Sequence, residues 1–185
     1  MAQLVCPWWL GYLLASPVRR LFEDPAKVLA PYVREGMTVL EPGPGMGFFT
    51  LELGRLVGPS GRVVAVDIQP RMLSSLKRRA ARAGLLERVD ARLAAPDTLG
   101  IADLAGAVDF TLAFALVHEL PAVEPFFAEV AMASKSGAGL LFAEPAGHVK
   151  KADFEVEMEA AIHAGFELVA RPAIRRSHAA FLKRA

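Results

Sequence analysis

The sequence has a single cysteine, Cys6, and only two tryptophans and two tyrosines among its 185 residues. One thiol cannot form an intramolecular disulfide bond or a cysteine-rich metal site, so disulfide scaffolds and zinc ribbons are excluded. The shortage of cysteine fits a reducing compartment, and we expect a cytoplasmic protein. The chain also lacks an excess of either charge, because 21 basic residues oppose 20 acidic ones. This balance argues against binding to nucleic acid through bulk charge, although it leaves room for a local basic patch.

Long hydrophobic runs are absent as well. An apolar stretch near the start, residues 4–15, is far shorter than the roughly 20 residues that cross a bilayer, and Pro7 and Gly11 interrupt it. No Lys or Arg precedes it, as one would in a signal peptide. We therefore expect no membrane span and interpret residues 1–23 as an N-terminal apolar lid or cap. The alternative for this segment is a helix packed on the sheet, and its notable residues are Trp8, Trp9 and Tyr12.

The rest of the chain alternates short apolar runs with amphipathic stretches. A chain with 54% hydrophobic residues can bury a full core, and its length suits one domain. Nearly continuous apolar runs are typical of parallel strands that are covered on both faces. The predicted strands are residues 37–42, 62–67, 88–94, 108–115 and 139–144. The predicted helices are residues 25–33, 47–56, 70–83, 123–133 and 151–164.

The C-terminal end departs from this alternation. Two strand-like runs, residues 166–171 and 177–183, are joined only by residues 172–176, which leaves no room for a helix and forces an antiparallel pair. The sequence therefore predicts an α/β fold: a Rossmann-like, seven-stranded, mostly parallel sheet with helices on both faces and a C-terminal antiparallel β-hairpin. We expect residues 1–185 to form a single domain.

The first predicted strand runs directly into a glycine-rich loop, Glu41-Pro-Gly-Pro-Gly-Met-Gly47, and a helix follows. Glycine allows a tight turn and lets backbone N–H groups approach a ligand, and open α/β sheets bind ligands at the carboxyl ends of their strands. The dinucleotide-binding pattern G-x-G-x-x-G fails, because Phe48 takes its last position. No Lys-Ser/Thr pair follows, so the loop is not a P-loop. Glu41 would repel a pyrophosphate, which favours a ligand with a positive ammonium or sulfonium group.

The segment Val39-Leu-Glu-Pro-Gly-Pro-Gly-Met-Gly-Phe-Phe-Thr50 resembles the first motif of the class I S-adenosylmethionine-dependent methyltransferases, an acid followed by alternating glycines after a strand. Asp67, which ends the second predicted strand, matches the ribose-binding acid of that family, and the terminal hairpin matches its sixth and seventh strands. The resemblance extends over roughly residues 24–185, and within the family the chain is similar to the small methyltransferases of quinone biosynthesis. The alternative is a plain strand-to-helix turn with a chance acid.

This resemblance implies that the cofactor is S-adenosyl-L-methionine, and it implies a role for each matching residue. Gly43, Gly45 and Gly47 would line the methionine portion of the cofactor. Glu41 would receive its ammonium group, directly or through water. Asp67 would accept hydrogen bonds from both ribose hydroxyls, which one carboxylate can do, and it is also a candidate N-cap for the next helix.

Recognition of the adenine is where the sequence departs from the family. By the resemblance, Ile68 would pack against the ring. Members of the family usually carry an acid just after the third strand, and Ala95 holds that place here. Asp97, two residues later, is the substitute that we expect to contact the adenine. Its alternative role is the N-cap of a short helix over residues 98–104.

Candidate catalytic residues follow the fourth predicted strand, whose end faces the transferred methyl group in this family. His118 and Glu119 are the titratable residues there, and as a pair they can take a proton from an acceptor nucleophile. The alternative for His118 is structural, in which it orders the loop that leads into the next helix. His148, after the fifth strand, is interpreted as a surface loop residue. No local spacing supports a metal site.

The implied reaction is displacement at a sulfonium methyl, for which the protein supplies mainly positioning, exclusion of water and sometimes a base. We expect a small-molecule acceptor of apolar character, and no nucleic-acid partner, because the basic run at residues 77–82 suits a helix C-terminus. The alternatives are an NAD(P)-dependent oxidoreductase and a non-catalytic cofactor-binding protein of the same fold. Neither the acceptor nor the oligomeric state follows from the sequence. The expected apolar rim comprises Trp8, Trp9, Phe114, Leu116 and Val117.

Overall fold

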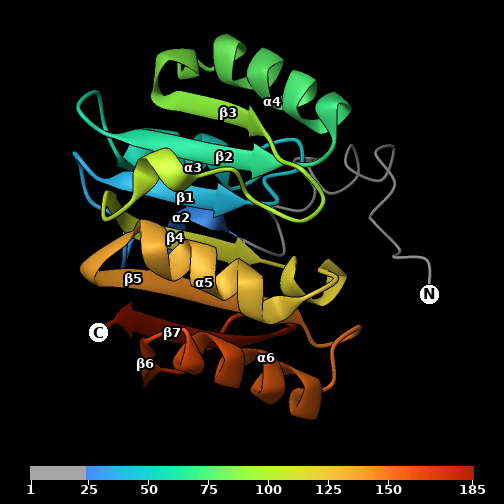
Figure 1. Ribbon diagram of the computed structural model, residues 1–185. Coiled ribbons are helices and arrows are strands. Elements are labelled where there is room, and N and C mark those ends of the chain that lie inside the picture. Colours follow the sequence, from blue (N-terminus) through green and yellow to red (C-terminus); the bar gives the residue numbers. More distant parts are fainter. Residues whose placement is uncertain (1–23) are drawn as a thin grey trace. The chain divides into compact units, whose positions relative to one another are not determined.

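The computed structural model describes residues 24–185. The predicted lid, residues 1–23 with Trp8, Trp9 and Tyr12, lies outside the described residues. The strand order is β3-β2-β1-β4-β5-β7-β6, and this mostly parallel, seven-stranded sheet with a C-terminal antiparallel hairpin confirms the predicted fold class. Contacts divide the described chain into two compact parts, residues 24–96 and residues 97–185 (Figure 1).

The first part, residues 24–96, is built around strand β2. Its elements are α2 (Pro25–Leu29), β1 (Thr38–Pro42), α3 (Thr50–Leu56), β2 (Arg62–Asp67), α4 (Pro70–Arg82), the 3-10 turn η2 (Leu86–Arg88) and β3 (Val89–Leu93). Strand β2 pairs in parallel with β1 on one side and with β3 on the other. Residues 63–66 of β2 are at most 1% exposed. A strand buried on both faces needs apolar side chains at successive positions, which explains its uninterrupted apolar run.

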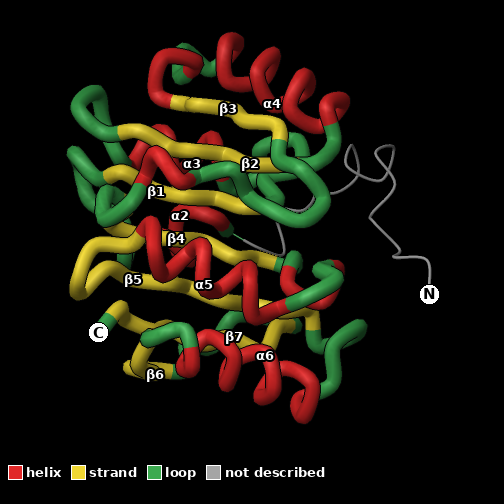
Figure 2. Tube along the Cα trace, viewed as in Figure 1, coloured by secondary structure: helices red, strands yellow, loops and turns green. Residues whose placement is uncertain are grey.

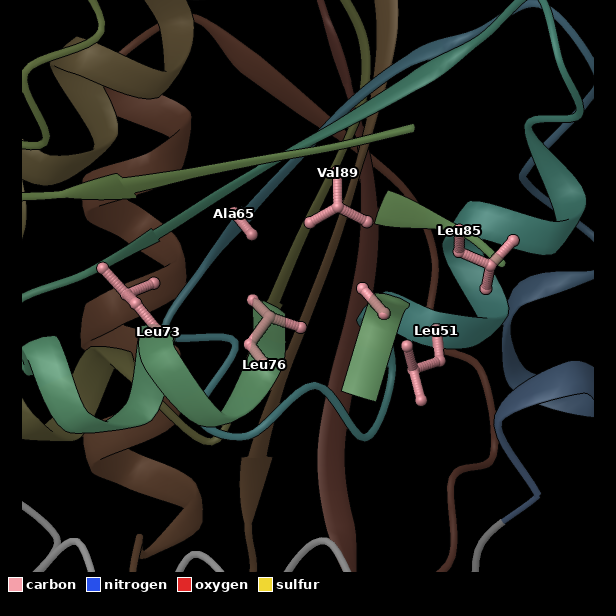
Figure 3. Packing of buried hydrophobic residues seen from close by; sticks show 7 residues of the cluster. Leu51, Ala65, Leu73, Leu76, Leu85 and Val89 are labelled. Carbon is pink, nitrogen blue, oxygen red and sulfur yellow. The ribbon is translucent and has the colours of Figure 1, made fainter. Parts of the chain in front are cut away.

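Helix α4 covers β2 and β3 through one apolar face. Pro70 suits the first helical position because its fixed φ is already helical, and Gly84 ends the helix in the left-handed conformation, with φ +68°. Full burial of a leucine such as Leu76 contributes about 1.5–3 kcal/mol. Figure 3 shows how the labelled side chains of this core converge. The cluster consists of Leu51, Ala65, Leu73, Leu76, Ala80, Leu85 and Val89.

The second part, residues 97–185, contains the C-terminal hairpin. Its elements are the 3-10 turn η3 (Ala102–Leu104), β4 (Val108–Phe114), the 3-10 turn η4 (Val117–Glu119), α5 (Val123–Ala133), β5 (Ser134–Pro145), α6 (Lys151–His163), β6 (Phe166–Ala170) and β7 (Ser177–Arg184). Strands β4 and β5 are parallel, whereas β7 is antiparallel to both β5 and β6. Figure 2 shows these four strands with α5 and α6 lying along them. The short connection at residues 172–176 joins β6 and β7 as an antiparallel pair, as predicted.

A row of aromatic rings joins α5 and α6 to the same face of β5. Phe127 of α5 meets Phe142 of β5 edge to face, with ring centroids 5.7 Å apart. Phe154 of α6 stacks on the same Phe142 ring at 4.7 Å and also lies 5.7 Å from the ring of His178 on β7. Offset and edge-to-face pairs of this kind add about 0.5–1.5 kcal/mol to the burial of the rings. They hold α6 at the carboxyl end of β5.

Several predicted boundaries are wrong, and each has a local reason. Helix α3 begins at Thr50 and not at Gly47, because Gly45 and Gly47 have positive φ values of +54° and +85°, which a helix cannot contain. Helix α2 ends at Leu29, four residues earlier than residue 33. The predicted helix at residues 98–104 is reduced to the three-residue η3, whose N-cap is Ile101, so Asp97 caps no helix.

Candidate active site

The glycine loop is a tight turn between β1 and α3, and its backbone takes conformations that favour glycine. Gly43, Gly45 and Gly47 have φ values of +67°, +54° and +85°. A Cβ on Gly45 would meet no atom within 4 Å, so that glycine borders open space. A Cβ on Gly47 would lie 2.4 Å from a methyl carbon of Leu76, so that glycine lets α4 pack closely against the loop. The two glycines thus serve different purposes: access at position 45 and packing at position 47.

Asp67 ties this loop to the end of β2. One carboxylate oxygen, Oδ2, accepts a hydrogen bond from the Gly45 N–H at 3.3 Å. The other, Oδ1, accepts one from the Gln69 N–H at 2.8 Å. The alternative role of Asp67 as the helix N-cap is wrong: the N-cap is Gln69, whose side chain makes no capping bond, and Asp67 bonds the Gln69 N–H instead. The acid therefore orders both loops that lead away from β1 and β2.

Glu41 is buried at the base of the same loop, at 4% exposure. Its Oε2 atom is enclosed and has no hydrogen-bond partner among residues 24–185. Burial raises the pKa of Glu41 to about 8, although the Thr50 side chain opposes the rise, and the charge of Asp67 adds to it. An unsatisfied buried carboxylate is costly, and a cationic group placed against Oε2 would remove that cost.

The three residues expected near the adenine lie at or near the ends of β2 and β3. Ile68 follows β2 directly and is 43% exposed, which is unusual for a large apolar side chain. Ala95 is exposed after β3 in the first part. Asp97 is an exposed turn residue at the start of the second part. The arrangement offers Ile68 as an apolar surface, and the adenine contacts of all three stay predictions.

Arg79 contributes to this loop in a way that sequence reasoning missed. Its guanidinium, on α4, donates a hydrogen bond to the backbone carbonyl of Met46. The basic run was interpreted only through the helix dipole, yet this arginine fastens α4 to the glycine loop. The two residues are 33 positions apart in the chain, so no local pattern pointed to the contact.

His118 is paired with Glu144, and the predicted role of His118 and Glu119 in taking a proton stays a prediction. The Nδ1 atom of His118 hydrogen-bonds to Oε2 of Glu144, and 26% of the His118 side chain remains exposed. Glu144 is fully buried. Its Oε1 accepts hydrogen bonds from the N–H groups of Leu116 at 3.1 Å and Val117 at 2.7 Å. The hydrogen bond to Glu144 raises the pKa of His118, against the opposing effect of burial.

The partnership of His118 and Glu144 follows from the sheet. Strands β4 and β5 are parallel, with Phe114 opposite Ala143, so the residues that follow both strands gather at one edge. Glu144 thereby reaches the first turn after β4, where its bonds to the Leu116 and Val117 N–H groups hold the start of η4. With Nδ1 engaged, the second ring nitrogen, Nε2, is the one left to exchange a proton.

Other predicted residues at this edge are less suited to the acceptor. Val117 is fully buried and cannot form part of an apolar rim, whereas Phe114 and Leu116 are half-buried. Glu119 is half-buried on η4. His148 is an exposed residue of the turn after β5, as interpreted from the sequence. Among residues 24–185, no group of three or more His, Cys, Asp or Glu has the arrangement of a metal site.

Comparison with known families decides the class. A family model described as "Methyltransferase domain" matches residues 33–178, most of the chain. The chain belongs to this methyltransferase family. A crystal structure of an S-adenosylmethionine-dependent methyltransferase from Aquifex aeolicus superposes with a TM-score of 0.86 at 23% identity, covering 98% of this chain and 100% of that one. Membership of this family excludes the alternative of an NAD(P)-dependent oxidoreductase and confirms S-adenosylmethionine as the cofactor.

The curated relatives match the chain over short segments. The tRNA (adenine(57)-N(1)/adenine(58)-N(1))-methyltransferase TrmI of Methanocaldococcus jannaschii is 36% identical over 56 residues, which is 30% of this chain and 20% of that protein. The ubiquinone/menaquinone biosynthesis C-methyltransferase UbiE of Klebsiella pneumoniae is 37% identical over 71 residues, which is 38% of this chain and 28% of that protein. The matched segments thus span less than a third of either relative.

The two sets of candidate functional residues lie in different parts of the chain. The glycine loop, Glu41 and Asp67 belong to residues 24–96, and the His118–Glu144 pair belongs to residues 97–185. Within the described residues, no helix combines the length and the apolar character needed to cross a bilayer.

Proposed function

We propose that this domain transfers a methyl group from S-adenosylmethionine to a small acceptor, with Glu41, the glycine loop and Asp67 holding the cofactor. The buried Oε2 of Glu41, which has no partner among the described residues, carries the proposal. A site built for a polyanion would not enclose an acid beside its glycine loop. An ammonium group is the chemistry that this atom lacks, and it would favour the ionised form of a carboxyl whose pKa is about 8 without it.

The cofactor residues fit this assignment in their geometry. S-adenosylmethionine, when bound, supplies an electrophilic methyl group on a sulfonium centre. Gly45 leaves its backbone open to the methionine portion, and Gly43 and Gly47 shape the turn. Asp67 accepts hydrogen bonds from the Gly45 and Gln69 N–H groups and would exchange part of this bonding for ribose hydroxyls. Ile68 offers an exposed apolar surface for the adenine. These roles remain proposals, as do those of Ala95 and Asp97.

His118 is proposed as the base that takes a proton from the acceptor at Nε2. Glu144 holds the ring by Nδ1 and stabilises the imidazolium that forms when the proton arrives. The raised pKa of His118 increases its proton affinity, so the ring accepts a proton readily but is neutral only at higher pH. Glu119 contributes negative charge nearby and is not the orienting partner.

A ligand-binding experiment tests the cofactor assignment. S-adenosylhomocysteine should raise the melting temperature, because a ligand that binds only the native state stabilises it. NAD and NADP should leave the melting temperature unchanged. Calorimetry that detects nicotinamide binding and no S-adenosylhomocysteine binding would overturn the assignment. Turnover of labelled S-adenosylmethionine with pooled metabolites then separates a catalyst from a cofactor-binding protein without activity.

RNA is the second candidate acceptor, and helix α4 favours it. Four basic residues, Arg71, Lys77, Arg78 and Arg82, are exposed on this helix, and the helix contains no acidic residue. Between residues 70 and 92, seven basic residues stand against two acidic ones in a chain of net charge +1. The expectation of no nucleic-acid partner was based on the total charge, which conceals this local excess, and on the assignment of the basic run to a helix C-terminus. The printed names of curated relatives include a tRNA methyltransferase.

The RNA alternative predicts a salt-dependent affinity. Fluorescence anisotropy with labelled tRNA would compare wild type with Lys77→Gln/Arg78→Gln/Arg82→Gln. A control variant, Arg175→Gln/Arg176→Gln/Lys183→Gln, removes the same charge from the C-terminal hairpin. Loss of binding in the α4 variant alone, with a shallower dependence on salt, would support an RNA acceptor. Equal behaviour of both variants would leave the small-molecule acceptor as the sole candidate.

A further inference from the structure

A small pocket lies in the second part of the chain, between the first turns of α6 and the start of β7. Figure 1 shows α6 running beside the C-terminal hairpin of β6 and β7. The volume of the pocket is about 210 Å³. This is less than the roughly 300–1,000 Å³ of pockets that enclose a whole small molecule, so the pocket suits one group of a larger ligand. Its polar lining consists of Lys151, Glu155, Arg171, Ser177 and His178.

The lining of this pocket carries an excess of positive charge. Arg171 donates two parallel hydrogen bonds to the carboxylate of Glu155, at 2.8 and 2.7 Å. These bonds lower the pKa of Glu155, although burial opposes the change, and the charges of Lys151 and His178 also favour the ionised form. One carboxylate therefore stands against the two cations of Lys151 and Arg171. The guanidinium has five N–H donors, and the bonds to Glu155 and a contact with the Met158 sulfur at 3.6 Å leave donors for a second oxyanion.

The pocket shares a face and an edge of the sheet with the His118–Glu144 pair. Glu144 of β5 lies directly opposite His178 of β7 in the antiparallel ladder, and opposed residues project to the same face with Cβ atoms about 4.5–5.5 Å apart. Phe154 lies on this face too, because it stacks on Phe142 at 4.7 Å and lies 5.7 Å from the His178 ring. The carboxyl ends of parallel strands, where β5 ends, are the edge at which open α/β sheets bind ligands. Through Glu144, the pocket is therefore next to the candidate base.

We propose that this pocket binds an anionic group, a carboxylate or a phosphate, of the small acceptor whose nucleophile is presented to His118. The inference rests on the proposed function and narrows its acceptor to molecules that carry an oxyanion. Lys151 would supply positive charge, and Arg171 and the Ser177 hydroxyl would donate hydrogen bonds to the oxyanion. A cation would find no comparable partner, because Glu155 is already engaged by Arg171. The pocket holds the acceptor and takes no part in moving its proton.

Titration with inorganic phosphate tests the anion site without acceptor or cofactor. Phosphate is added to about 50 mM at fixed pH and constant ionic strength, because added salt screens surface charge. The NMR signals of the His178 ring report binding, and they are assigned by nuclear Overhauser contact with the Phe154 ring, 5.7 Å away. In wild type we expect a His178 shift that saturates. Lys151→Gln should lower the affinity about two- to fivefold, and Lys150→Gln, a control at the adjacent exposed lysine outside the pocket lining, should keep the wild-type affinity.

Two results would overturn the anion site. One is a His178 signal that does not respond to phosphate, and the other is an equal loss of affinity in Lys151→Gln and Lys150→Gln, which would indicate a general effect of surface charge.

The acceptors found in the metabolite screen test the link to methyl transfer. They should carry a carboxylate or a phosphate, and Lys151→Gln should raise their KM about two- to fivefold with kcat unchanged, because the ion pair stabilises the ground state and the transition state equally. Methylation of acceptors that lack an oxyanion, or an unchanged KM, would refute this role of the pocket. A protein that transferred no methyl group would refute the proposed function, while the phosphate titration would still decide whether the pocket binds anions.

Discussion

Replacing Glu41 with Gln tests the electrostatics of the cofactor site directly. Burial raises the pKa of Glu41 in the folded protein to about 8, from 4.5 for an ordinary glutamate. Between these values the folded state binds one proton more than the unfolded chain, so the free energy of unfolding falls as pH rises. The destabilisation is absent below pH 4.5 and complete above about pH 8. Gln keeps the shape of the side chain and cannot ionise, so the variant lacks this slope.

The raised pKa of Glu41 sets the size of two effects, one on stability and one on cofactor affinity. The two pKa values of Glu41, 4.5 and about 8, make cofactor-free Glu41→Gln more stable than wild type by about 3 kcal/mol at pH 7, and equally stable at pH 4.5. Cofactor affinity depends on the ionised fraction of Glu41, which increases about 25-fold between pH 6 and pH 7.5. Wild-type affinity for S-adenosylhomocysteine should rise by the same factor, whereas the affinity of Glu41→Gln should be low at both values.

Urea unfolding between pH 4.5 and 8.5 measures the first effect, and calorimetry with S-adenosylhomocysteine measures the second. Glu87→Gln is a matched control, because Glu87 is exposed and in the same part of the chain. It should leave both pH dependences as they are in wild type. If Glu41→Gln unfolds with the wild-type pH slope, Glu41 does not hold a proton in the folded state. If its affinity for the ligand is unchanged, Glu41 does not receive the ammonium group.

Four further substitutions probe the two sets of candidate functional residues. Asp67→Asn should lower S-adenosylhomocysteine affinity by about 1.5–3 kcal/mol and should leave the protein folded; unchanged affinity in calorimetry would contradict the ribose role. Gly45→Ala should lower the free energy of unfolding by about 1–2 kcal/mol, because its backbone is left-handed. Gly47→Ala should lose that amount and about 1–3 kcal/mol more, because its Cβ also overpacks against α4. Equal urea midpoints of the two variants would contradict the different roles of the two glycines. Glu144→Gln should lower the pKa of His118, because the carboxylate that bonds its Nδ1 is lost, and should reduce turnover by about 10²-fold. A profile of turnover against pH identical to that of wild type would contradict a part for the pair in proton transfer.

The candidate cofactor residues were the more predictable set, because their features are contiguous in the sequence. A glycine loop directly after an apolar strand, with an acid at its start, occupies residues 41–47, and Asp67 ends the very next strand. Strand ends and tight turns are local features, and local sequence specifies them through backbone freedom and apolar patterning. The alternation of strands and helices, with a connection too short for a helix near the C-terminus, determined the fold class in the same way.

Tertiary structure alone decided the partners of the polar side chains. His118 and Glu144 are 26 residues apart, as their hydrogen bond records, and they meet because the carboxyl ends of two parallel strands lie at one edge. The sequence singled out His118 and Glu119 as the titratable residues after the fourth strand, and it did not indicate the contact with Glu144. The contact of Arg79 with the glycine loop depends in the same way on how α4 packs. The enclosure of Glu41 likewise follows from packing, because the degree of burial, and the pKa that results from it, is set by elements distant in the chain.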